Sequence, residues 1–173
     1  MEMNEQQPQR PEQLNDIAQL MGCTTWNDGA KLALSRIDSH AKFTPPSVPY
    51  EVEILRTIKL VNNETENTFD HYGETLLNLG TSAWLGLTNS EQTVMPTLLV
   101  QRQLKYGPQN IMAFTYKGIA IRMADKVARI ENGGENFADE AYTDAVMDLV
   151  GYTAIAIMLH DGTFHLPVQA TIL

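Results

Sequence analysis

The sequence has little of what stabilises small secreted or metal-bound domains. Cys23 is the only cysteine among 173 residues, so no disulfide can form within the chain. Neither Cys23 nor the four histidines show the spacing of zinc ligands. The composition therefore predicts a protein of a reducing compartment, and we expect it in the cytoplasm.

Long apolar runs are also missing. No stretch contains the roughly 18 uninterrupted apolar residues that cross a bilayer, and the N-terminus lacks the apolar core of a signal peptide. We therefore expect neither secretion nor membrane insertion. Residues 1–12 are rich in Gln, Glu and Pro, which predicts a disordered segment, and residues 13–173 fit a single helical domain.

Alternation of apolar and polar residues is short and rare, which leaves little basis for a sheet. Apolar residues instead recur three or four apart in several segments, as in helices. For the last dozen residues a docked tail and a short strand remain open. The expected helices are Asn27–His40, Tyr50–Val61, Thr68–Trp84, a helix from about Met95 with Pro96 in its first turn and Gly107 at its end, Lys117–Ile130 and Asp139–His160.

One segment is apolar or small on every side. Residues 149–159 (LVGYTAIAIML) show no polar face, which is typical of a helix surrounded by other helices. Small residues around Gly80 favour a close approach between two helices. The sequence thus predicts an all-α fold, a compact multi-helix bundle with a central apolar helix near residues 141–159.

Charge is unevenly distributed along the chain. The net charge of -9 argues against binding to a long nucleic acid, because such affinity comes from excess Lys and Arg. Yet six of the twelve basic residues lie between positions 102 and 129, where Asp125 is the only acid. No Lys or Arg follows position 129. A basic segment followed by an acidic one is the pattern that needs an explanation.

On a helical wheel, Arg122, Asp125, Lys126 and Arg129 share an arc of about 100°. In the next helix Asp144 and Asp148 are four residues apart, so they share a face that continues into the core. Unpaired carboxylates near a core cost several kcal/mol unless a cation meets them. The partner is a divalent ion, the cationic stripe, or both around a phosphate; the alternative is a solvated face with ordinary surface ion pairs.

A bound nucleotide would give each group a role. Asp144 and Asp148 would hold Mg²⁺, while Arg122, Lys126 and Arg129 would bind the phosphates. Asp125 is either a third metal ligand or the partner of a neighbouring arginine. By residue type, Asn110, Phe114 and Tyr116 are candidates for contacts to a base.

Several short motifs lie in the last part of the chain: KYGPQN at 105–110, GI at 118–119, RMADKVARI at 122–130, and Asp144 followed by DLVGY at 148–152. Together they resemble the nucleotide-modification-associated domain of phages and bacteria. The resemblance covers about the last 75 residues. It implies a protein of phage or bacterial nucleotide metabolism, located in the host cytoplasm if a phage encodes it. Many relatives have an acid where this chain has Lys105.

More distantly, the acidic helix that continues through Asp148 into an apolar stretch is similar to the third helix of MazG-type all-α nucleoside triphosphate pyrophosphohydrolases. The similarity implies Mg²⁺-dependent chemistry and carries over Asp144 and Asp148 as catalytic, metal-binding carboxylates. The preceding helix lacks that family's Glu-Glu-x-x-Glu cluster. Either other acids complete the site, namely Glu51 and Glu53 or Asp70 and Glu74, or the chemistry differs.

Three functions remain open from the sequence, and whether the protein is an enzyme is one of the open questions. The first is a Mg²⁺-dependent hydrolysis of a nucleoside triphosphate or modified nucleotide to a monophosphate and pyrophosphate. The second is non-catalytic binding or sequestration of a nucleotide, for instance by a phage protein that counters a host defence signal. The third is a helical interaction protein without a small ligand. For all three we expect a homo-oligomer.

Overall fold

The computed structural model describes residues 21–46, 48, 50–63, 66–133 and 139–170, and within these ranges the fold is all-α, as predicted. The N-terminal segment 1–12 and the start of the predicted domain lie outside the described residues. In chain order the elements are α2 (Trp26–Phe43), α3 (Tyr50–Asn62), α4 (Phe69–Leu85), α5 (Asn89–Tyr106), α6 (Gln109–Met112), α7 (Thr115–Gly133), α8 (Asp139–Asp161) and the 3₁₀ helix η2 (Thr163–His165).

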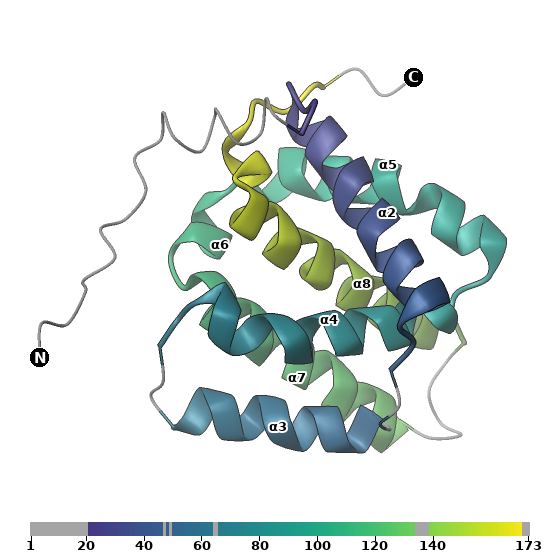
Figure 1. The fold of residues 1–173 in the computed structure, drawn as a ribbon. Coiled ribbons are helices and arrows are strands. Elements are labelled where there is room, and N and C mark those ends of the chain that lie inside the picture. The colour runs from purple at the N-terminus through teal and green to yellow at the C-terminus, as the bar shows by residue number, and fades with distance from the viewer. Residues whose placement is uncertain (1–20, 47, 49, 64–65, 134–138, 171–173) are drawn as a thin grey trace, which may run out of the picture.

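Helix α8 lies at the centre of the bundle, and α2, α4, α5 and α7 all contact it (Figure 1). Leu149, Val150, Ala154 and Met158 are fully buried. The prediction of a central apolar helix is therefore confirmed. By length and composition alone, Ala141–Asp161 is also long and apolar enough to span a membrane. The search for uninterrupted apolar residues did not indicate this. In this fold more than half of that stretch is buried against other helices.

Among the glycines that the structure describes, Gly80 lies in the tightest surroundings, where α4 packs against α8. A Cβ atom built on Gly80 would lie 2.1 Å from Thr153 Oγ1 and 2.3 Å from Thr153 Cβ. The Thr153 hydroxyl donates a hydrogen bond to the Leu76 carbonyl oxygen (2.9 Å), so the threonine is held in place from α4. The predicted role of Gly80 in close packing is confirmed.

Helix α5 begins earlier than predicted. Thr88 is its N-cap, and a reciprocal pair of hydrogen bonds between Thr88 and Glu91 satisfies the first amide groups. Pro96 consequently lies inside the helix and not in its first turn. The end is as predicted, because Gly107 takes a positive φ of 67° that ordinary residues avoid.

Residues 162–170 form a docked tail, which is one of the two alternatives for the C-terminus. Gly162 has a φ of 80° and turns the chain into η2. The Pro167 carbonyl then accepts a hydrogen bond from the Trp26 amide (2.9 Å), and Asn27 bonds the backbone of Gln169. The tail therefore binds the first turn of α2.

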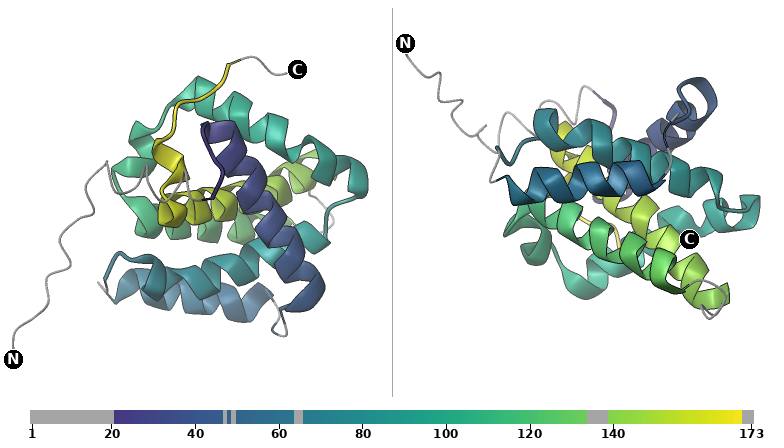
Figure 2. Two further views of the ribbon diagram at one scale, coloured as in Figure 1. Left: turned by 45° about the horizontal axis from the view of Figure 1, so that its top comes forward. Right: turned by 90° about the horizontal axis from the view of Figure 1, so that it is seen from below.

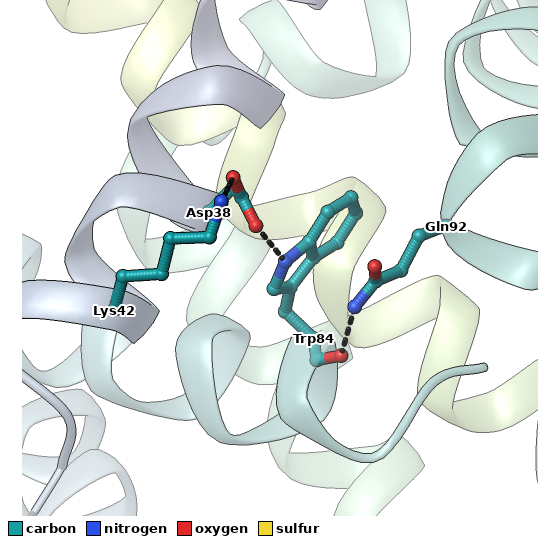
Figure 3. A network of polar contacts seen from close by, with 4 residues as sticks. All are labelled: Asp38, Lys42, Trp84 and Gln92. Atoms are coloured by element: carbon teal, nitrogen blue, oxygen red, sulfur yellow. Dashed lines mark hydrogen bonds and ion pairs between the residues drawn. The ribbon is translucent and has the colours of Figure 1, made fainter. Parts of the chain in front are cut away.

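A polar network joins α2, α4 and α5 at one corner of the bundle (Figure 3). Asp38 accepts hydrogen bonds from the Trp84 indole (3.0 Å) and the Lys42 ammonium (2.8 Å), and Gln92 donates to the Trp84 carbonyl (3.0 Å). The bond from Lys42, followed by that from Trp84, holds the pKa of Asp38 below its ordinary value. The network fixes the N-terminal half of α5.

Helix α3 packs against α4 and α7 at the periphery of the fold, as the view from below shows (Figure 2). Only one side of α7 is buried, although apolar residues and alanines cover most of its circumference. Ile119, Met123 and Val127 form the buried side, whereas Ile121 is half exposed. Association into a homo-oligomer stays a prediction.

Candidate functional site: a cavity beside Asp148

A cavity of about 370 Å³ lies among α2, α5, α6, α7 and α8. This volume falls in the range of roughly 300–1,000 Å³ that is usual for small-molecule sites. Apolar and aromatic side chains form much of its wall, and charged groups are confined to three residues. Those residues are Arg102, Lys126 and Asp148.

The three charged residues form one group. Both oxygens of Asp148 are engaged, one by Arg102 Nη1 at 2.6 Å and the other by Lys126 Nζ at 2.8 Å. The Asp148 side chain is 17% exposed and that of Lys126 22%, so solvent screens this group less than a surface pair. Two cations and one anion leave a net charge of +1 at the cavity wall.

Local sequence explains how these side chains reach the cavity. Arg102 lies in the last turns of α5, and Gly151 faces it from α8. A Cβ on Gly151 would lie 3.1 Å from the Leu99 side chain and 3.7 Å from Arg102 Nη1. The glycine therefore leaves room for α5 to bring the guanidinium to Asp148, which is one turn earlier on α8.

The other predicted phosphate and metal groups are not brought together. Arg129 pairs with Asp125 at 3.2 Å, and their side chains are 60% and 57% exposed. Asp144 is also exposed. Of the predicted cations only Lys126 contacts Asp148. Asp125 was predicted either as a metal ligand or as the partner of a neighbouring arginine, and it forms the ion pair with Arg129.

Arg122 lies next to the cavity rim. Its Nη2 donates to the carbonyl oxygen of Asn110 at 3.3 Å, while its buried Nη1 has no partner among the described residues. Asn110, one of the predicted base contacts, lines the cavity, and its contact with a base stays a prediction. Arg122 thus holds α6, the short helix that closes one side of the cavity.

The two predicted aromatic base contacts lie elsewhere. Phe114 is exposed and does not line the cavity; its carbonyl oxygen accepts a hydrogen bond from Asn67. Tyr116 packs edge-on against Phe69. Burial, with a smaller contribution from the charge of Asp161, raises the pKa of Tyr116 to about 12.

A titration checks the position of Tyr116. Its phenol is more acidic in the unfolded chain, with a pKa near 10, so folding is favoured less as the pH rises from about 10 towards 12. We expect ultraviolet absorbance to show a step near pH 12 from the ionisation of Tyr116, and this step should be missing from the Tyr116→Phe variant. A folded Tyr116→Phe variant with an unchanged titration curve would contradict the assignment.

The donor set around Asp148 does not fit the Mg²⁺ site that the resemblance implies. Cations occupy both of its oxygens, and the described residues contain no cluster of three or more His, Cys, Asp or Glu side chains suited to a metal. The other acids considered do not complete it. Glu53 pairs with Arg56, whereas Asp70 and Glu74 line a separate cavity between α3 and α4. The side chain of Glu51 lies outside the described residues.

Sequence analysis missed Arg102 and Gln103 as site residues. Arg102 is one of the six basic residues between positions 102 and 129. Gln103 lies four residues after Leu99 on the buried side of α5, so a polar residue within an apolar stripe was the available signal.

The chain matches no family model, no curated protein and no solved structure in the three comparisons made.

Proposed function

We propose that this protein binds a small phosphate-bearing ligand of the nucleotide class in the cavity beside Asp148, and that it does so without a divalent metal. The observation that carries the proposal is the pair of cations, Arg102 and Lys126, that converge on one carboxylate at a cavity wall. Their excess positive charge attracts an anion, and the guanidinium offers paired donors for phosphate oxygens.

The rest of the cavity suits the organic part of such a ligand. Tyr106 and Tyr152 line it together with Ile111 and Ile155, so a planar ring would meet aromatic and aliphatic surface. The nucleotide class comes from the resemblance described above. The alternative that the same resemblance implies is hydrolysis with Mg²⁺. That alternative requires metal-binding side chains in addition to Asp148.

Calorimetric titration of a panel of nucleotides, canonical, modified and cyclic, in EDTA and in Mg²⁺ tests the proposal. We expect binding in EDTA, and we expect Asp148→Asn to bind as tightly as the wild-type protein or more tightly, because it removes an anion from the site. Asp144→Asn, one turn away and exposed, is the matched control and should change nothing.

Two results would contradict metal-independent binding. One is a strict requirement for Mg²⁺ together with release of phosphate or pyrophosphate that Asp148→Asn abolishes, which would favour the hydrolase. The other is an absence of binding across the panel in both buffers, with no rise in thermal stability, which would favour a helical interaction protein.

A further inference from the structure

Gln103 is a polar residue at a buried position of α5. It is 9% exposed, and its neighbours Leu99 and Val100 are apolar and buried. Its backbone carbonyl accepts a hydrogen bond from the Gly107 amide at 2.9 Å. Its side-chain amide makes no hydrogen bond with another described residue, and it lines the cavity beside Asp148.

Gln103 is buried as a residue, but its amide nitrogen and oxygen are not among the fully buried side-chain atoms that lack a partner, so they are reached from the cavity. Leucine or methionine would fill the same space without placing donors and an acceptor at the cavity wall. The cavity is the open side of this amide. Its partner is therefore whatever occupies the cavity.

The amide lies next to one of the two cations, Arg102, on α5. Gln103 directly follows Arg102, and both side chains line the same cavity. On the side formed by α2, the wall includes Trp26, which is 1% exposed and whose indole nitrogen has no hydrogen-bond partner among the described residues. A ligand whose phosphate lies at Arg102 thus places its remaining part against Gln103 and an aromatic wall.

We propose that Gln103 is a specificity-determining residue that recognises the edge of a nucleobase. A carboxamide carries two donors and one acceptor side by side, so it pairs with a planar edge that offers an acceptor next to a donor. A sugar phosphate or pyrophosphate has no such edge. This inference rests on the proposed binding of a nucleotide at Asp148.

The test compares two ligands in two variants. Gln103→Met keeps the size of the side chain and removes the amide. We expect its affinity for the nucleotide that the wild-type protein prefers to fall about tenfold to a hundredfold, as for the loss of one or two hydrogen bonds. Its affinity for ribose 5-phosphate, which lacks the base, should stay within about twofold. Gln101→Met, exposed on the same helix, is the matched control for the substitution itself.

Thermal unfolding should show Gln103→Met to be as stable as the wild-type protein, because an unpaired amide is replaced by an apolar group. Should Gln103→Met fail to fold, Gln103→Asn keeps the amide but withdraws it by one methylene, and the same base-dependent loss is expected. An equal fall for both ligands, or no fall, overturns the role of Gln103 while nucleotide binding stands. Wild-type protein that binds no nucleotide overturns both proposals.

Discussion

Replacing Gly80 with alanine should lower the free energy of unfolding by roughly 2–3 kcal/mol, the largest stability effect we expect from one added methyl group. The new Cβ would lie 2.1–2.5 Å from three side-chain atoms of Thr153, one of them that residue's own Cβ. A β-branched side chain inside a helix cannot rotate away from such a contact, so α4 and α8 must separate. Thermal unfolding should show a fall in Tm of roughly 4–12 °C.

Two variants test the cause of that loss. Gly151→Ala adds the same methyl group within α8, where the nearest atom is a leucine methyl at 3.1 Å that can move, and we expect a change within about 1 kcal/mol. Combining Gly80→Ala with Thr153→Gly removes the colliding Cβ and should restore part of the stability. Thr153→Ala would retain that atom and should not. A Gly80→Ala variant as stable as the wild-type protein would show that the helices are not this close.

Replacing Lys126 with methionine should weaken nucleotide binding by about 10-fold to 150-fold, the largest effect on affinity that we expect. Hydrogen bonds to charged groups contribute roughly 1.5–3 kcal/mol, and the change also reduces the charge of the site from +1 to 0. Asp148 keeps its bond to Arg102, so no unpaired carboxylate is created. Titration calorimetry in EDTA measures the loss directly.

Arg129→Met is the matched control, because Arg129 lies three residues later on the same helix and differs chiefly in where it points. Its partner is Asp125, and both are mostly exposed. We expect affinity within about twofold of wild type, since exposed ion pairs contribute little. Equal losses in Lys126→Met and Arg129→Met would indicate a ligand held by the whole stripe that the helical wheel predicted.

Local patterns in the sequence predicted the helices well, because hydrophobic periodicity and caps are properties of neighbouring residues. Residues 149–159 predicted the centre of the bundle from composition alone. Pro96 was misplaced because proline favours a first turn, whereas the capping pair of Thr88 and Glu91 starts the helix earlier. Packing between helices, such as Gly80 against Thr153, could be anticipated only as a tendency of small residues.

The candidate site was predicted only in part, because it depends both on neighbouring residues and on how distant helices pack. Lys126 and Asp148 lie on consecutive helices that contact each other, so a charge argument could bring them together. Which part of the charged arc faces the cavity depends on α5, and nothing in residues 117–160 indicates where α5 packs. Arg102 therefore lines the cavity and Arg129 does not, and Gln103 and Tyr106 line it whereas Phe114 and Tyr116 do not.

The chain has two tryptophans, and the fold puts them in different surroundings. Trp26 forms part of the cavity wall, whereas Trp84 belongs to the polar network with Asp38 and Gln92 and does not line the cavity. Their fluorescence consequently offers two separate signals. In a Trp84→Phe background, emission from Trp26 would report what enters the cavity; in a Trp26→Phe background, emission from Trp84 would follow unfolding of the corner where three helices meet.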